Sequence, residues 1–128
     1  MSNILFDTSA VLALINNEYG KESAEKFLGS ISISSVNLSE LYSKLMDYGI
    51  NEEEIKEITV SVINKVIDFD KDLSLEAARL RSITKSKGLS LGDRACIATG
   101  IKYNLEIYTA DKAWLDCSIT KAKINLIR

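Results

Sequence analysis

The sequence predicts an α/β protein built on a parallel sheet that is covered by helices on both faces. Short apolar segments, which read as buried strands, alternate along the chain with longer segments of helical period. Alternation of this kind is typical of parallel sheets. The length of 128 residues suits one domain, and 46% hydrophobic with 27% charged residues is ordinary for a globular protein. We therefore expect residues 1–128 to form a single domain.

The first half of the chain is expected to hold two strands and four helices. In order, these are the strand Asn3–Phe6, the helices Thr8–Ile15 and Lys21–Leu28, the strand Ile31–Ser35, the helix Val36–Tyr48, and a helix from Asn51 to about Ile63. Proline is absent, so the boundaries rest on Gly, Asn, Ser and the hydrophobic period. Asn51 and Glu54, for example, have the spacing of a capping box.

The second half is expected to alternate in the same way. In order, it holds a strand or turn at Val66–Phe69, the helix Leu73–Ser86 closed by Gly88, the helix Ser90–Asn104, the strand Glu106–Thr109, a helical turn at Lys112–Leu115 and the strand Ile124–Ile127. In parallel sheets, ligands gather beyond the carboxyl ends of the strands. Acidic residues at those ends are therefore the first candidates for a functional site.

The composition excludes several classes of enzyme. Histidine is absent, which rules out Ser-His-Asp and Cys-His mechanisms and zinc sites built on imidazole. Neither G-x-x-x-x-G-K-[ST] nor G-x-G-x-x-G occurs, so cradles for phosphate or dinucleotides lack support. The net charge of −2 gives no basic footprint for a nucleic acid, although bound cations can reverse the local sign.

The location of the protein is expected to be cytoplasmic. Cys96 and Cys117 read as small core thiols and fit a reducing compartment. No apolar run approaches the ~18 residues of a membrane span, and the start of the chain lacks the basic segment of a signal peptide.

Four acidic residues occur at strand ends or helix starts. Asp7 directly follows the first strand, and Asp111 comes two residues after the strand Glu106–Thr109. Glu40 and Asp93 lie in the first turns of their helices. In a parallel sheet Asp7, Glu40 and Asp111 open onto one edge, and Asp93 can join them there if the amino end of its helix points to that edge.

Each acid also has a purely structural interpretation as a helix cap. Asp7 and Asp111 could be N-caps of the elements that follow them. Asn37–Glu40 has the spacing of a capping box, and Ser90 with Asp93 has a similar one. Four independent caps need not converge in space, whereas four metal ligands must.

A convergent cluster of four carboxylates predicts bound cations. Two carboxylates about 4 Å apart repel by ~4 kcal/mol at an effective dielectric constant of 20, so the cluster needs protons or cations. Oxygen ligands suit Mg²⁺ or Mn²⁺. A pair of such ions can stabilise both the attacking and the leaving oxygen of an in-line displacement at phosphorus. This chemistry needs no histidine, and the sequence leaves open whether one ion or two would act.

Three further residues are candidates near the acids. Ser9 lies two residues after Asp7, and Thr109 lies two residues before Asp111. Either hydroxyl could orient a carboxylate or bind a metal-bound water. Asp116 could add a ligand, with an ordinary surface position as the simpler interpretation. Trp114 is expected to be a packing residue.

Four segments of the chain resemble the PIN domain, and more narrowly a VapC-type toxin of a toxin–antitoxin pair. They are Asp7-Thr-Ser-Ala, Asn37-Leu-Ser-Glu40, Leu89-Ser-Leu-Gly-Asp93-Arg-Ala-Cys-Ile-Ala and Thr109-Ala-Asp111-Lys-Ala-Trp114. The resemblance spans nearly the whole chain, and the two later segments together are quite specific. It implies a three-layer α/β/α fold on a mainly parallel central sheet.

The resemblance also implies an activity and partners. It implies an Mg²⁺- or Mn²⁺-dependent endoribonuclease, which is a homodimer and is inhibited by a small antitoxin protein. The family's acidic quartet corresponds to Asp7, Glu40, Asp93 and Asp111, and its hydroxyl residue beside the fourth acid to Thr109. Arg94 is a candidate contact to RNA phosphate, with a solvated surface position as its alternative.

Other functions remain open on the sequence alone. A PIN-like scaffold could bind RNA or a protein without cutting. A receiver-type signalling domain has similar length, but it needs paired acids after the first strand, and Asp7 has no acidic neighbour. A haloacid-dehalogenase-like phosphatase needs Asp-x-Asp where this chain has Asp7-Thr8-Ser9.

Overall fold

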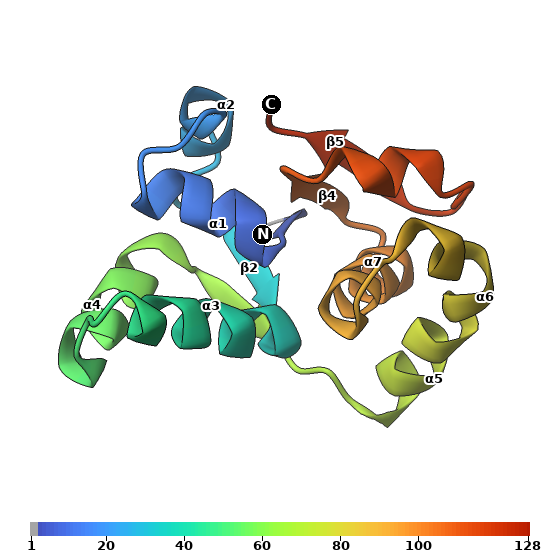
Figure 1. Ribbon diagram of the computed structural model, residues 1–128, viewed down its shortest axis with the longest axis horizontal. Helices are drawn as coiled ribbons and strands as arrows, with labels where there is room; N and C mark the ends of the chain where they lie inside the picture. Colours follow the sequence, from blue (N-terminus) through green and yellow to red (C-terminus); the bar gives the residue numbers. More distant parts are fainter. Residues whose placement is uncertain (1–2) are drawn as a thin grey trace.

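The computed structural model describes residues 3–128, so Met1 and Ser2 of the predicted domain and chain start lie outside the described residues. The elements are, in order, β1 (Ile4–Phe6), α1 (Thr8–Ile15), α2 (Lys21–Glu25), β2 (Ile31–Ser34), α3 (Ser35–Asp47), α4 (Glu52–Val62), β3 (Lys65–Ile67), α5 (Lys71–Arg79), α6 (Arg81–Thr84), η1 (Lys85–Lys87), α7 (Leu91–Tyr103), β4 (Glu106–Thr109), η2 (Lys112–Asp116) and β5 (Lys123–Leu126). Figure 1 shows how they are arranged.

The strands form one five-stranded sheet in the order β3-β2-β1-β4-β5, with every pair parallel. The predicted α/β class and parallel sheet are therefore confirmed. The central strand β1 is only three residues long, and Phe6 pairs with Ile33 on one side and Tyr108 on the other. All three residues of β1 are buried, as expected for a strand with helices on both of its faces.

Alternate residues of β1 belong to two different cores. Ile4 and Phe6 pack with α1, α2, α3 and α4 on one face of the sheet, whereas Leu5 packs with α5 and α7 on the other. This alternation follows from the two-residue period of a strand. The layers are visible in Figure 1, where α3 and α4 lie on one side and α5, α6 and α7 on the other. The three-layer α/β/α arrangement is confirmed.

Some predicted boundaries were wrong for local reasons. The expected helix Leu73–Ser86 starts earlier, because Asp70 accepts a hydrogen bond from Leu73 N, and it breaks into α5, α6 and η1. The segment Val66–Phe69, expected to be a strand or a turn, is a strand that ends at Ile67, because the N–H of Phe69 leaves the ladder and donates to Ser35 Oγ.

The amino ends of four elements point to the carboxyl edge of the sheet. β1, β2 and β4 end at Phe6, Ser34 and Thr109, and α1, α3 and η2 begin within three residues of those ends. Helix α7 runs into β4 through the short connection at Asn104, so its other end, the amino end, lies at the same edge. This edge is where the predicted acids occur.

Within residues 3–128, no helix combines the length and apolar character needed to cross a membrane.

Candidate active site

The four predicted acids line one cavity at the carboxyl edge of the sheet. Its volume is about 230 Å³. The lining residues are Asp7, Thr8, Ser9, Leu12, Glu18, Asn37, Glu40, Lys44, Asp93 and Asp111. The amino ends of α1, α7 and η2 supply Asp7, Asp93 and Asp111, and a helix amino end favours negative charge beside it. Glu40 was expected in the first turn of its helix, but it lies beyond that turn because α3 already begins at Ser35. The four acids therefore converge in the fold, although a role as helix caps would not require them to do so.

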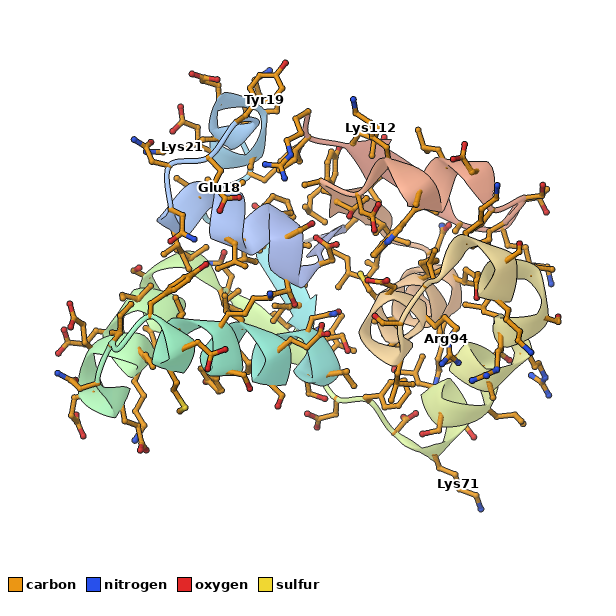
Figure 2. The ribbon with its side chains drawn as sticks, viewed as in Figure 1. Glu18, Tyr19, Lys21, Lys71, Arg94 and Lys112 are labelled. Carbon is orange, nitrogen blue, oxygen red and sulfur yellow. The ribbon has the colours of Figure 1, made fainter. Side chains whose placement is uncertain are left out.

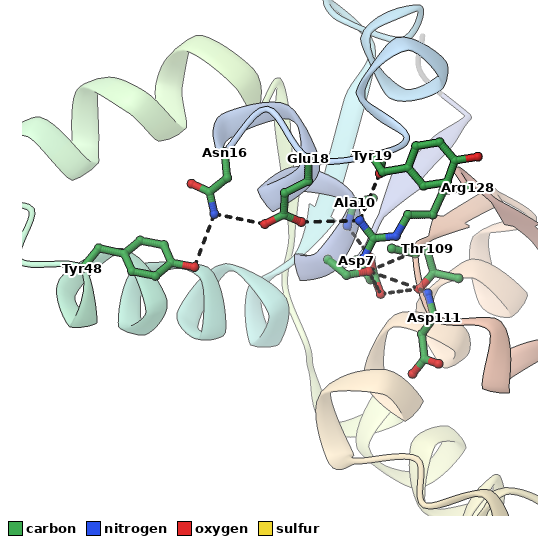
Figure 3. A network of polar contacts seen from close by, with 11 residues as sticks. Asp7, Ala10, Asn16, Glu18, Tyr19, Tyr48, Thr109, Asp111 and Arg128 are labelled. Atoms are coloured by element: carbon green, nitrogen blue, oxygen red, sulfur yellow. Dashed lines mark hydrogen bonds and ion pairs between the residues drawn. The ribbon is translucent and has the colours of Figure 1, made fainter.

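Asp7 is the most enclosed of the acids, with 4% of its surface exposed. It is the N-cap of α1, and its Oδ1 accepts a hydrogen bond from Ala10 N at 2.9 Å. The hydroxyl of Thr109 donates to Oδ2 at 2.6 Å, a short bond typical of an ionised acceptor. Figure 3 shows this network around Asp7. The structural and the functional interpretations of Asp7 are thus compatible.

Two hydroxyls are oriented toward Asp7 by the backbone. Ser9 Oγ accepts from Ala110 N at 2.9 Å, and Thr109 Oγ1 accepts from Asp111 N at 3.1 Å. Each hydroxyl then directs its proton at Asp7, with Ser9 Oγ 2.8 Å from Oδ1. The loop after β4 therefore fixes the position of the Asp7 carboxylate through two relays.

The carboxylate of Glu40 is held on one oxygen only. Oε1 accepts from Asn37 Nδ2 at 2.9 Å and lies 3.1 Å from Thr8 Oγ1. Among residues 3–128, no hydrogen bond to Oε2 is found, which leaves that oxygen for a ligand. The predicted capping box at Asn37 was wrong: β2 runs directly into α3, and Ser34 is the N-cap, accepting from Val36 N. Asn37 therefore lies inside the first turn.

Asp93 and Asp111 both have a cap role as well as a place in the cavity. Ser90 and Asp93 form the predicted capping box of α7, in which Ser90 N donates to Asp93 Oδ2 at 3.0 Å. Asp111 is the N-cap of η2 and accepts from Ala113 N at 2.9 Å through Oδ1. Each acid uses one oxygen for its cap, so the other oxygen can serve the cavity.

The charges of the cluster act on one another. Burial raises the pKa of Asp7 from 3.8 to about 6, and the hydrogen bonds from Thr109, Ala10 and Ser9 oppose that rise. The pKa of Asp93 is also raised, first by burial and then by the negative charges of Asp111 and Glu40. Burial, and then the negative charges of Asp7, Asp93 and Glu40, raise the pKa of the Cys96 thiol well above its usual range. A cation in the cavity would relieve this repulsion.

Other predicted residues lie away from the cavity lining. Asp116 ends η2 in an exposed position. Arg94 donates from Nη1 to the carbonyl of Ala77 at 3.1 Å, so its guanidinium is directed to α5, and Figure 2 shows it on that side. Their roles as ligand and RNA contact stay predictions. Trp114 is fully buried, which confirms it as a packing residue.

The cysteines are free thiols, as predicted. Both Cys96 and Cys117 are buried in the core formed with α5 and α7, and they form no disulfide.

The prediction missed residues whose signal exists only in three dimensions. Asn37 reaches α7 as well as Glu40, because its Nδ2 donates to the carbonyl of Gly92 at 3.1 Å. Glu18 and Lys44 line the cavity from outside the motifs. Glu18 is paired with Arg128, at 3.5 Å, as Figure 3 shows. Nothing in the local sequence around these residues distinguishes them from surface positions.

The donor set fits a hydrated divalent cation better than a closed metal cage. Carboxylate oxygens and raised pKa values favour a hard cation. Within residues 3–128, however, no three His, Cys, Asp or Glu side chains are arranged as a ready metal site. Mg²⁺ suits such a cavity, because it usually keeps several waters and is held by one or two carboxylates together with substrate phosphate.

Comparison with known families decides the fold family. The PIN domain family matches residues 4–118. The chain belongs to the PIN domain family. This membership removes the receiver-type and phosphatase alternatives. A sequence search of curated proteins found no match.

This PIN domain resembles toxins in solved structures. It aligns with a toxin–antitoxin complex from Klebsiella pneumoniae at a TM-score of 0.73 and 22% identity, covering 98% of both chains. VapBC2 from Rickettsia felis, bound to promoter DNA, gives 0.71 and 19%, with 96% of this chain and 97% of that one covered. Mycobacterium tuberculosis VapC20, a toxin that cleaves the sarcin–ricin loop, gives 0.72 and 20%, covering 93% and 98%. At these identities the likeness concerns the fold.

Proposed function

We propose that this PIN domain is an Mg²⁺- or Mn²⁺-dependent endoribonuclease. The observation that carries the proposal is the meeting of Asp7, Glu40, Asp93 and Asp111 in one cavity from four separate elements. A scaffold without catalysis has no need to gather four repelling carboxylates, two of which have raised pKa values. Membership of the PIN family and the toxin-like fold are consistent with nuclease chemistry.

Some residues of the cavity would hold the cation, and others orient the carboxylates that hold it. Glu40 Oε2 and the uncapped oxygens of Asp93 and Asp111 would hold the cation, together with Asp7. Bound there, a divalent cation would lower the pKa of a water and neutralise charge on the phosphate. Ser9 and Thr109 keep the Asp7 carboxylate in one pose through their donated hydrogen bonds. Lys44, on the wall of the cavity, supplies positive charge toward an RNA phosphate.

The test is cleavage of total cellular RNA by purified protein, with Mg²⁺ or Mn²⁺ against EDTA. We expect discrete products that need the metal and disappear in Asp7→Asn. Asp47→Asn is the matched control, because it removes an exposed acid outside the cavity lining, and it should cleave like the wild type. Cleavage that persists in Asp7→Asn, or that continues in EDTA, would contradict the proposal.

We also propose that the protein is the toxin of a type II toxin–antitoxin pair and is a homodimer. The support is the likeness in fold to chains from toxin–antitoxin complexes. Expression of the chain alone in a bacterial host should arrest growth, and co-expression of a small protein encoded beside it should restore growth. Light scattering should give about twice the protomer mass of 14.2 kDa. Growth equal to that of the Asp7→Asn strain would argue against the toxin.

A further inference from the structure

The carboxylate of Glu40 is fixed by contacts from three helices. From its own helix α3, Asn37 Nδ2 donates to Oε1 at 2.9 Å. From α1, the Thr8 hydroxyl lies 3.1 Å from the same oxygen and 3.0 Å from the carbonyl of Asn37. From α7, Gly92 faces the carboxylate. Glu40 is therefore the acid of the cavity whose pose depends on the packing between helices.

The observed position of the Glu40 carboxylate leaves no room for a side chain at Gly92. A Cβ built on Gly92 would lie 2.4 Å from Glu40 Oε1 and 2.5 Å from Oε2, which is closer than such atoms can come. The backbone of Gly92 has no positive φ, so its glycine is needed for space and not for conformation. Any side chain at this position must displace the Glu40 carboxylate or separate α7 from α3.

Asn37 joins the two helices that meet at this point. Its two amide hydrogens go to different acceptors, Glu40 Oε1 and the carbonyl of Gly92 at 3.1 Å. Both partners are acceptors, so the nitrogen must face them. Asn37 is 1% exposed, and its Oδ1 has no partner among residues 3–128. The amide is thus oriented by its two donated hydrogen bonds, and its own acceptor, Oδ1, is left without a partner among residues 3–128.

We propose that Asn37 and Gly92 are positioning residues that set the pose of the Glu40 carboxylate for metal binding. The inference rests on the proposed function and deepens it. Asn37 engages Oε1 in a hydrogen bond, so that Oε2 remains free to bind the metal. Gly92 has no side chain, and the carboxylate fits into the space that this leaves. A methyl group at Gly92 should therefore weaken metal binding without any change in the four acids themselves.

The experiment compares two glycines of one helix. Mn²⁺ binding is measured by calorimetry for the wild type, Gly92→Ala and Gly100→Ala. Gly100 is the control, because its added Cβ would meet the core side chain of Ile107 and not an acid. We expect Gly92→Ala to weaken Mn²⁺ binding by roughly tenfold or more, the usual effect of disturbing a residue behind a ligand. Gly100→Ala should keep its affinity while its melting temperature changes.

A double-mutant cycle shows whether the effect passes through Glu40. In a Glu40→Ala background the carboxylate is absent, so Gly92→Ala should weaken Mn²⁺ binding no further. Asn37→Leu, which keeps the shape of the side chain and removes its donors, should behave like Gly92→Ala. Unchanged Mn²⁺ affinity in Gly92→Ala, or an equal loss in both backgrounds, would overturn the inference and leave the proposed function intact. No Mn²⁺ binding by the wild type would overturn both.

Discussion

At the scale of single residues, the hydrogen bonds that stabilise the Asp7 anion are outweighed by the effect of its burial. Its pKa is about 6 because loss of water outweighs the hydrogen bonds from Thr109, Ala10 and Ser9. The carboxylate can therefore bind a cation at neutral pH, and without a cation it takes up a proton as the pH falls toward 6. Cap and ligand are the same carboxylate, which is why the cap interpretation alone could not exclude function.

In the absence of metal, the wild type should lose stability relative to Asp7→Asn as the pH rises. The folded pKa of Asp7, about 6, lies above its usual value of 3.8, so between these values the folded state holds a proton that the unfolded chain has lost. Stability conferred by that proton is present at pH 4 and is lost as the pH rises through 6. The variant lacks this loss. The free energy of unfolding of the variant minus that of the wild type should therefore rise by about 3 kcal/mol between pH 4 and pH 7. Urea unfolding in EDTA measures it; a pH-independent difference would contradict the assignment.

Thr109→Val should move the activity of the nuclease to higher pH. In the wild type, the hydrogen bond from Thr109 lowers the pKa of Asp7. The variant lacks this bond, so the pKa of Asp7 should rise further. RNA cleavage at pH 6 should fall by roughly tenfold relative to cleavage at pH 8, since a hydrogen bond to a charged group is worth about 1.5–3 kcal/mol and about 1.4 kcal/mol is a factor of ten. Thr99→Val is the control, because Thr99 is equally buried but donates to Ala95 O inside α7. Equal pH profiles for the two variants would show that Thr109 has no special role.

At the scale of elements, three of the four acids lie at helix amino ends, and local sequence rules predicted some helix starts better than others. The capping box of Ser90 and Asp93 was predictable, because the motif and the helix start coincide. The start of α3 was predicted to within one residue, but its cap was not, because Ser34 both ends a strand and caps the helix. Asn37 lies inside the helix, as the predicted helix bounds imply, but its contact to α7 is encoded by no local pattern.

Ser90→Ala should separate the stability of α7 from its contribution to the cavity. Loss of an N-cap typically costs ~1 kcal/mol, and here it also frees Asp93 from one hydrogen bond that lowers its pKa. Asn51→Ala removes the cap of α4, in which the side chain accepts from Glu54 N, outside the cavity lining. Both variants should lose similar stability in urea unfolding, but only Ser90→Ala should need more Mn²⁺ for half-maximal cleavage. An unaltered Mn²⁺ requirement would mean that the cap acts on the fold alone.

At the scale of the whole molecule, topology brings together acids that are up to 104 residues apart in sequence, from Asp7 to Asp111. The alternation of strands and helices predicted the parallel sheet, and the parallel sheet predicted one edge for the acids. The strand order β3-β2-β1-β4-β5 and the approach of α7 to α3 depend on side-chain packing between distant segments. For that reason Glu18 and Lys44 could not be assigned to the cavity beforehand.

Metal should stabilise the whole fold through this cavity. A cation that binds only the folded state adds free energy by mass action, about 2.7 kcal/mol at a concentration 100 times Kd. Millimolar Mn²⁺ should raise the melting temperature of the wild type, and EDTA should reverse the rise. Asp93→Asn should show little shift. A rise of the same size in Asp93→Asn would place the bound metal elsewhere.

The most direct measurement is anomalous diffraction from a crystal of the protein soaked in MnCl₂. The account predicts an anomalous peak inside the cavity, bounded by Asp7, Glu40, Asp93 and Asp111, and its loss in Asp93→Asn crystals soaked in the same way. An empty cavity in the wild type, or manganese found only at surface acids such as Asp116, would contradict the claim that these four carboxylates form one metal-binding active site.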